Sequence, residues 1–287
     1  PAGVVSTLTG TAVCVPIPHP SVDPADGVGV TPVIGVASPF VALGGIAADA
    51  AGNLYVTDPA RHTVSRITTE GAVTTLAGMA GAQGNTDGIG TAARFNAPAG
   101  ITTDRSGHLY VTERGNPTIR KISPAGVVTT LAGAAGEYGF GDGTGSAAKF
   151  LGLEGITADG VGNLYVAEFG NSTIRRITPA GVVTTIAGMA GATGNTDGTG
   201  SAARFNYPTD ITTDGAGNLY VADGFNHTIR KVTSEGVVTT VAGVAGRSGI
   251  ILGSLPGGLD HPSGITAINA RLLAITTGNS VLRLVLP

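Results

Sequence analysis

The chain has 287 residues and a net charge of −3, and only 12% of its residues are charged, so it lacks the basic field that holds a nucleic-acid backbone. Glycine (47 residues) and proline (16 residues) are abundant, but 42% of the residues are hydrophobic, which suffices for a core if they are patterned. No run of about 18 apolar residues predicts membrane insertion, and the sequence opens without a charged and then apolar leader. We expect a soluble mature domain, or one domain of a longer chain.

Cys14 is the only cysteine, so no internal disulfide can form and cysteine usage does not assign a compartment. It lies in the segment TAVCVPIPHP, which is typical of a small buried hydrophobe. Few lysines and many Gly, Thr and Ala residues favour an extracellular or surface protein of bacterial origin, which we expect to be a monomer.

The chain begins with PAGVVSTLTG at 1–10, and nearly the same residues return as PAGVVTTLAG at 124–133 and PAGVVTTIAG at 179–188. A long connection, 11–44, follows. A unit of about 55 residues then starts with GIAADAAGNLYVTD and repeats. The units are 45–99, 100–154, 155–209, 210–263 and the weaker 264–287, and they start at Gly45, Gly100, Gly155, Asp210 and Gly264.

Each unit contains four short runs rich in β-formers and bounded by turn residues. In the best-kept copy they are ITTD at 211–214, NLYVAD at 218–223, HTIRKVT at 227–233 and GVVTTVAG at 236–243. Units of this length with four strands predict an all-β fold, a five-bladed β-propeller. Six blades is the alternative, but 11–44 is too short for a hidden blade.

The last unit ends in NSVLRLVLP, which matches NSTIRRITP at 171–179 and lacks the fourth strand. We expect residues 1–10 to supply this strand, so that the last blade is closed by hydrogen bonds to the N-terminal segment and residues 1–287 form a single propeller. An exposed sheet edge would thereby be covered.

The stretch GNLYVADGFNHTIRKVT at 217–233, with the following GVVTTVAG, resembles the NHL repeat. The resemblance covers the first four units well and the fifth weakly. It implies a β-propeller, and it does not imply one activity, because NHL propellers include lyases, lactonase-like enzymes and plain binding scaffolds.

We name the four strands of a unit A to D in chain order. Strands A and C run one way and B and D the other, so the A–B and C–D turns share one face. The B–C loops and the D–A connections share the opposite face, which we call the long-loop face. Connections there reach about 20 residues, as at 188–208, and long loops on a rigid scaffold are where binding sites concentrate.

Three units place Asn three residues and Arg seven residues after an acid that ends strand B. The sets are Glu113/Asn116/Arg120, Glu168/Asn171/Arg175 and Asp223/Asn226/Arg230. Carboxylates can do acid–base work, but an active site is needed once and a scaffold contact is needed in every blade, so we interpret these as structural ion pairs. The first unit has Arg61 and Ser65 instead, and in the last unit Thr276 replaces the acid while Arg283 is kept.

Two other acids repeat. The first set, in Asp-x-x-Gly-Asn turns, is Asp49, Asp104, Asp159 and Asp214, which we interpret as turn formers. The second set, in the D–A connections, is Asp87, Asp142 and Asp197, beside Phe95, Phe150 and Phe205. Each acid of the second set stands nearly alone, whereas calcium needs several oxygen ligands, so we expect an acid that satisfies its loop next to a buried phenylalanine plug.

Residues that do not repeat are the better guide to function. Aromatic side chains gather in the loops around the third unit: Tyr138, Phe140, Phe169, Tyr207 and Phe225. Exposed rings on one rim can stack on sugars or seat a peptide side chain, whereas the structural alternative is that they pack the loops together.

Histidines give a competing patch, because His19, His62, His227 and His261 all fall on the long-loop face in neighbouring units of a closed ring. Converging imidazoles suit zinc with an open position for catalysis. The resemblance adds that an amidating-lyase branch of NHL propellers holds zinc through histidines. No two of these residues have the short spacing of a ligand pair, which argues against a metal site.

No Gly-x-Ser-x-Gly motif or phosphate loop is present, and the residues expected to line the axis are threonines: Thr102, Thr157, Thr212 and Thr266. This lining argues against an axial metal centre and against an enzyme. We therefore expect a binding or scaffold module that engages a protein or glycan through the long-loop face, with no cofactor. The alternatives are a metal-dependent lyase or hydrolase with zinc or calcium, and a structural spacer in a larger surface protein.

Overall fold

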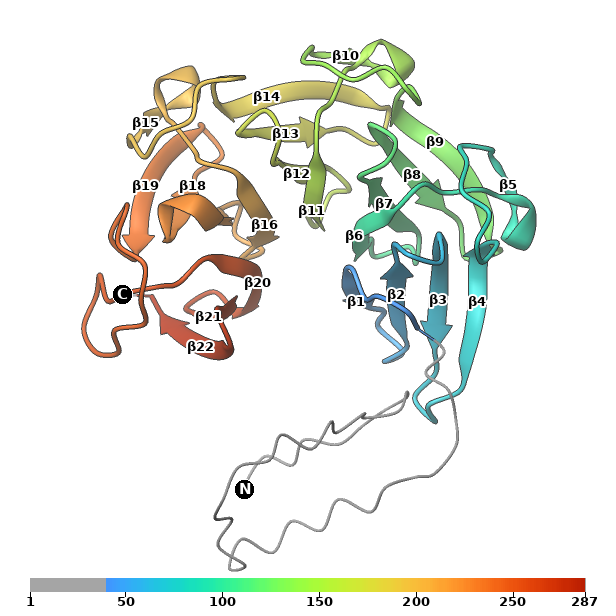
Figure 1. Cartoon of the computed structure of the whole chain (residues 1–287), viewed down its shortest axis with the longest axis horizontal. Helices are drawn as coiled ribbons and strands as arrows, with labels where there is room; N and C mark the ends of the chain where they lie inside the picture. Colours follow the sequence, from blue (N-terminus) through green and yellow to red (C-terminus); the bar gives the residue numbers. More distant parts are fainter. Residues whose placement is uncertain (1–39, 287) are drawn as a thin grey trace, which may run out of the picture.

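The computed structural model describes residues 40–286 of the chain, and these form five antiparallel sheets arranged around a central axis (Figure 1). The predicted five-bladed β-propeller is confirmed. The predicted closing strand at 1–10, Cys14, His19 and most of the connection 11–44 lie outside the described residues. No helix among residues 40–286 is long and apolar enough to cross a bilayer.

The blades follow the repeat. Blade 1 contains β1 (Ile46–Ala48), β2 (Leu54–Asp58), β3 (Thr63–Ile67) and β4 (Val73–Gly78). Blade 2 contains β6 (Pro98–Thr103), β7 (Leu109–Glu113), β8 (Thr118–Ile122) and β9 (Val127–Gly133). Blade 3 contains β11 (Leu153–Ala158), β12 (Leu164–Glu168), β13 (Thr173–Ile177) and β14 (Val182–Gly188). Blade 4 contains β16 (Pro208–Thr213), β17 (Leu219–Asp223), β18 (Thr228–Val232) and β19 (Val237–Ala242).

Blade 5 has three strands among the described residues: β20 (Pro262–Asn269), β21 (Leu272–Thr277) and β22 (Ser280–Val285). The strands β1, β6, β11, β16 and β20 lie innermost (Figure 1). Three connections add a two-residue strand to the outer edge of the next blade, followed by a 3-10 turn. These strands are β5 (Gly88–Ile89) on β9, β10 (Gly143–Thr144) on β14 and β15 (Gly198–Thr199) on β19.

Apolar side chains fill the four junctions from blade 1 to blade 5. Between blades 1 and 2 these are Val64 of β3, Phe95 of the connection and Ile101 of β6, and all three are at most 5% exposed. Ile119, Ile174 and Ile229 repeat the first position, and Phe150, Phe205 and Leu259 repeat the second. Burying each such side chain contributes about 1.5–3 kcal/mol, so the junctions rather than isolated blades form the core.

The expected ion pairs lie inside the blades, fully buried. In blade 3, Arg175 Nη1 donates to Glu168 Oε2 at 2.9 Å, and Nη2 donates to Asp142 Oδ1 at 2.9 Å. Neither Glu168 nor Arg175 is exposed, and the guanidinium lies 5.1 Å from the centre of the Phe150 ring. Asp142 thus satisfies its connection next to the buried Phe150, as expected, and its partner is the arginine, which the sequence did not indicate.

The same contacts recur in blades 2 and 4. Arg120 bridges Glu113 and Asp87 at 3.1 and 2.7 Å, and Arg230 bridges Asp223 and Asp197 at 2.9 and 2.7 Å. We call each of these acid–arginine–acid sets a clamp. Asp87 and Asp197 thus bind an arginine, as Asp142 does.

Blades 1 and 5 are held differently. In blade 1, Asp58 accepts the backbone N–H groups of Val41 and Arg61. In blade 5 the expected positions are wrong, because a two-residue Gly278–Asn279 turn replaces the longer B–C loop and shifts the last strand. The pairing places Thr277 at the acid position and Leu282, not Arg283, opposite Ile275, where the other clamps have arginine.

Candidate functional site

The Asp-x-x-Gly-Asn turns occupy the face opposite the long loops, and their carboxylates are used within the turn. Asp49 Oδ1 accepts the backbone N–H groups of Ala51 and Asn53, each at 2.9 Å. The Asn53 side chain donates to Asp49 Oδ2, and this hydrogen bond holds the pKa of Asp49 below its usual value. Asp104, Asp159 and Asp214 make the equivalent backbone contacts, so these acids are turn formers.

A cavity of about 830 Å³ lies along the axis, lined by the innermost strands of all five blades. Thr102, Thr157, Thr212 and Thr266 line it, as expected. Three charged residues that the sequence did not place at the axis, Arg114, Glu154 and Asp210, also line the cavity.

Arg114 and Glu154 form a bidentate ion pair between blades 2 and 3. Arg114 follows β7 in the B–C loop, Glu154 lies near the start of β11, and both positions are at the long-loop end of the cavity. Arg114 Nε and Nη2 donate to the two Glu154 carboxylate oxygens at 2.7 and 2.6 Å. The Arg114 side chain is 52% exposed, and three of its five N–H groups are not used in the ion pair.

Asp210 occupies the position that is glycine in the other four units. Its carboxylate accepts the backbone N–H of Ile211 at 2.9 Å and that of Ile265, in blade 5, at 2.8 Å. Burial raises the pKa of Asp210 to about 6, and Glu154 adds to this shift. A Cβ at Gly155 would collide with Asp210 Oδ1, so the neighbouring strand must keep glycine there. The replaced glycine was a signal in the sequence that pointed to this residue.

Three of the five aromatic residues form one cluster on the long-loop face. The centres of the Phe169 and Tyr207 rings are 4.8 Å apart, those of Tyr207 and Phe225 are 5.1 Å apart, and those of Phe169 and Phe225 are 6.1 Å apart. Phe225 is 49% exposed, and Phe169 and Tyr207 are half-buried. We call Phe169, Tyr207 and Phe225 the aromatic ridge.

The backbone holds the ridge in place. Phe169 follows β12, Phe225 lies in the 3-10 turn Gly224–Asn226, and Tyr207 precedes β16 with a φ of 52°. The N–H of Tyr207 donates to Ser172 Oγ at 3.3 Å, which ties the connection to the preceding blade.

The other two aromatic residues lie outside the ridge. The Tyr138 hydroxyl donates to the carbonyl of Gly115 at 2.8 Å, and the Phe140 ring lies 5.2 Å from the Arg175 guanidinium. Both side chains thus interact with other parts of the fold, although each remains about half exposed.

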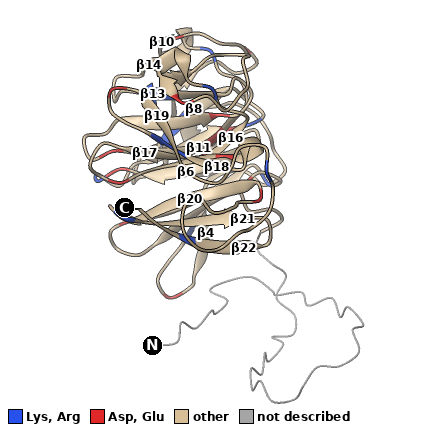
Figure 2. Cartoon of the chain, turned by 90° about the vertical axis from the view of Figure 1, so that its left-hand side faces the viewer, with Lys and Arg blue, Asp and Glu red and all other residues tan. Residues whose placement is uncertain are grey.

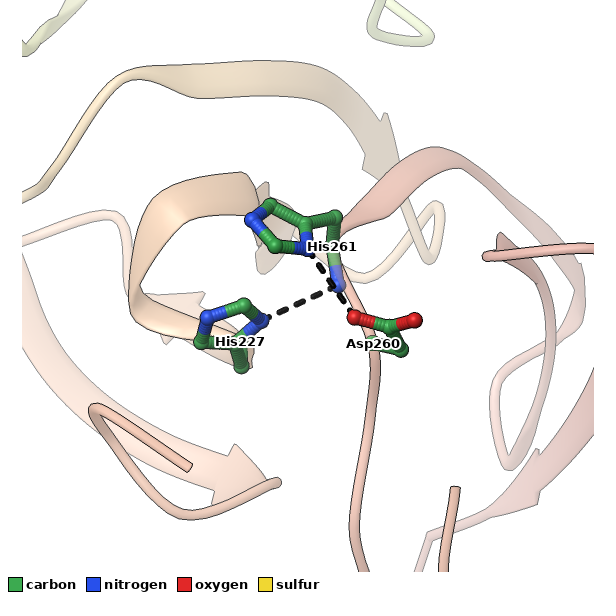
Figure 3. A group of neighbouring side chains, drawn as sticks. All are labelled: His227, Asp260 and His261. Atoms are coloured by element: carbon green, nitrogen blue, oxygen red, sulfur yellow. Dashed lines mark hydrogen bonds and ion pairs between the residues drawn. The ribbon is translucent and has the colours of Figure 1, made fainter. Parts of the chain in front are cut away.

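Two of the expected histidines come together beside the ridge (Figure 3). The ring centres of His227 and His261 are 4.1 Å apart, and the His261 backbone N–H donates to His227 Nδ1 at 3.1 Å. His261 Nδ1 lies 2.9 Å from Asp260 Oδ1, a residue that the sequence reasoning missed. Burial and the neighbouring His261 lower the pKa of His227, which favours a neutral ring.

One ligand atom from each of His227, Asp260 and His261 lies within 4.8 Å of the others, and among residues 40–286 this is the group with metal-binding geometry. His62 is not part of it. Its Nδ1 accepts the N–H of Ala97 at 3.1 Å, which is the same contact that His227 makes with His261. His227 therefore has a structural role in joining blades, and its Nε2 makes no hydrogen bond to residues 40–286.

Known proteins share both the repeat and the fold of this chain. Residues 205–232 match the family model of the NHL repeat, which confirms the resemblance seen in the sequence. A plant protein, SUPPRESSOR OF QUENCHING 1, chloroplastic, of Arabidopsis thaliana, is 36% identical over 95 residues. That match covers 33% of this chain and only 9% of the plant protein.

Solved structures with the same fold have different activities. An auxiliary nutrient binding protein from Bacteroides ovatus superposes with a TM-score of 0.63 at 19% identity, covering 83% of this chain and 57% of that one. A streptogramin B lyase superposes with a TM-score of 0.56 at 18% identity, covering 85% of this chain and 65% of the lyase. The chain thus spans less than two thirds of either structure, and identities this low show the fold alone.

Proposed function

We propose that this NHL-type propeller is a binding module that takes up a glycan on its long-loop face, with the aromatic ridge as the contact surface. The observation that carries the proposal is the assembly of three rings from three separate loops into one partly exposed cluster. Aromatic rings that stand partly in solvent offer apolar faces to a sugar ring. The fold-level similarity to a nutrient binding protein supports a binding role.

The axial cavity favours a glycan over a peptide as the partner. A sugar needs hydrogen-bond donors and acceptors for its hydroxyl groups, and the cavity offers both in the Arg114–Glu154 pair, the Asp210 carboxyl and the threonines. A peptide would instead need apolar pockets for side chains and pairing for its backbone. We infer that one end of the glycan enters the cavity while a further sugar lies on the ridge.

Replacing Tyr207 and Phe225 together by alanine should weaken glycan binding by about thirty-fold, because exposed aromatic rings at a binding site each contribute about 1 kcal/mol. An oligosaccharide array identifies the glycan bound by the unchanged chain, and calorimetric titration then measures Kd for each variant. Tyr138→Ala is the matched control, since it removes an equally exposed ring outside the ridge, and it should bind like the unchanged chain. Equal Kd values for all three proteins would disprove the ridge as the contact surface.

A metal-dependent lyase or hydrolase is the second candidate, favoured by the His227, Asp260 and His261 geometry. These residues fit a divalent metal in part. Nδ1 of His227 already accepts the N–H of His261, so His227 would bind an ion through Nε2. The Asp260 contact orients the His261 ring so that its Nε2 can bind. A bound zinc would supply a water of lowered pKa. Around it, the two imidazoles would hold the ion and the aromatic ridge would position the substrate.

This second candidate predicts about one equivalent of zinc in the purified protein, measured by mass spectrometry before and after a chelator. The variant His261→Ala should lose the metal, whereas His62→Ala should retain it, because His62 makes the same backbone contact outside the cluster. If the unchanged chain contains no more zinc than a buffer blank, the metalloenzyme is ruled out. The glycan proposal does not depend on this result.

A further inference from the structure

The two methionines of the chain lie at the same position of the repeat, on the long-loop face. Met79 follows the last residue of β4, and Met189 follows the last residue of β14, so each is the first residue of a connection between blades. Met79 and Met189 are each 43% exposed. A small oxidant in the solvent therefore reaches both side chains.

An arginine near the end of the same connection donates to each sulfur. Arg94 Nη2 lies 3.5 Å from Met79 Sδ, and Arg204 Nη2 lies 3.4 Å from Met189 Sδ. The other terminal nitrogen holds the guanidinium in place, because Arg94 Nη1 donates to the carbonyl of Thr91 at 2.6 Å and Arg204 makes the equivalent contact. Each arginine thus directs a charged donor at a thioether sulfur, which is a weak acceptor.

The connection between blades 2 and 3 provides a carboxylate for the same purpose. Ala134 stands there at the methionine position and Lys149 at the arginine position, and Lys149 pairs with Glu137. The residues equivalent to Glu137 in the two methionine connections are Ala82 and Ala192. Each of the three connections thus supplies one side-chain acceptor for its cation, and in two of them a sulfur takes the place of a carboxylate.

We propose that Met79 and Met189 are oxidation sites, at which a peroxide forms a sulfoxide that the neighbouring arginine binds. In this reaction a lone pair of Sδ attacks one oxygen of hydrogen peroxide, the O–O bond breaks and an S–O bond forms. The transferred oxygen gives its proton to the departing hydroxide, which leaves as water, so sulfur is oxidised and peroxide is reduced. The sulfoxide oxygen is a stronger acceptor than the thioether, and it accepts the N–H that the arginine directs at sulfur.

The surroundings of the two sulfurs decide the effect of oxidation on stability. Methionine oxidation disrupts apolar cores, because it introduces a polar oxygen there. Both sulfurs of this chain instead belong to partly exposed side chains and face a cation. The new hydrogen bond would join the first residue of each connection to the residue before its buried phenylalanine, Phe95 or Phe205. Oxidation should therefore stabilise these two connections.

The experiment uses the full chain with Cys14→Ser, which removes the one sulfur atom outside the methionines. Hydrogen peroxide at neutral pH should add one oxygen to each of Met79 and Met189, located by peptide mass spectrometry. Thermal unfolding followed by circular dichroism should then give a melting temperature about 2–4 °C above that of the untreated protein.

Two matched variants identify the cause of this rise. Ala82→Glu with Ala192→Glu gives both arginines the carboxylate that Glu137 supplies in the next connection, so peroxide should oxidise the methionines without raising the melting temperature. Met79→Leu with Met189→Leu should not respond to peroxide. Three results would overturn the inference: methionines that resist peroxide, an oxidised protein that melts at or below the temperature of the untreated one, or an equal rise in the glutamate variant.

Discussion

Replacing Arg175 by methionine should destabilise the protein by about 3–5 kcal/mol and lower its melting temperature by about 10 °C, because it leaves the Glu168 carboxylate buried without its cation. Glu168 would keep the donors from Leu151, Asn171 and Thr173 but lose the Arg175 contact at 2.9 Å. The substitution also releases Asp142 from the connection into blade 3. Thermal unfolding followed by circular dichroism measures the change.

Arg176→Met is the control for this experiment, since Arg176 is the adjacent residue on β13 with its side chain exposed. It should melt within about 1 °C of the unchanged chain. Adding Glu168→Gln to Arg175→Met should recover part of the loss, because no charge then remains buried. A melting temperature for Arg175→Met equal to that of the control would show that the clamp does not stabilise the blade.

Deleting residues 1–10 should lower the melting temperature by more than about 5 °C or cause aggregation, because the sequence predicts that this segment is the fourth strand of blade 5 and covers its outer edge. Exposed strand edges recruit other chains, so light scattering should rise with protein concentration. Differential scanning calorimetry and light scattering measure the two effects.

The control for the deletion is Ser6→Ala in the full chain, which keeps the backbone of the strand and should change neither property. Adding the peptide PAGVVSTLTG to the shortened protein should restore part of the lost stability, since the strand can bind without a covalent connection. An unchanged melt after the deletion would contradict the closure of blade 5 by this segment.

The strands and the acid–arginine pairs within each blade could be predicted from the sequence because the interactions that form them are local, whereas the second acid of each clamp, 33 residues before its arginine, was not predicted as its partner. Within a blade, the β-rich runs and Asp-x-x-Gly-Asn turns fix hairpins of known length, so Glu168 and Arg175, seven residues apart, fall on adjacent strands. Because the same pair recurs in three blades, we interpreted it as a structural contact and not as an active site. Blade 5 shows the limit of this reasoning, because its Gly278–Asn279 turn shortens one loop and moves the register, so the alignment chose Arg283 where the structure has Leu282.

The candidate site depended on the tertiary structure, because it is assembled from different blades. Arg114 and Glu154 are 40 residues apart and meet only because β7 and β11 lie side by side around the axis. The aromatic ridge brings together Phe169, Tyr207 and Phe225, while Tyr138 and Phe140 face other partners. The loop sequences showed that these aromatic residues are present, but they did not show which rings would contact one another.

The sequence by itself determined the repeat, the blade and the face that carries the long loops, since each follows from periodicity within about 55 residues. Only the tertiary structure decided which non-repeating residues share a site, because the radial arrangement of the blades sets distances between loops that no local pattern encodes. Asp210 illustrates what each level determines. In the sequence it is the one acid among the five residues that start the units. In the structure its carboxylate contacts blade 5 and lines the axial cavity.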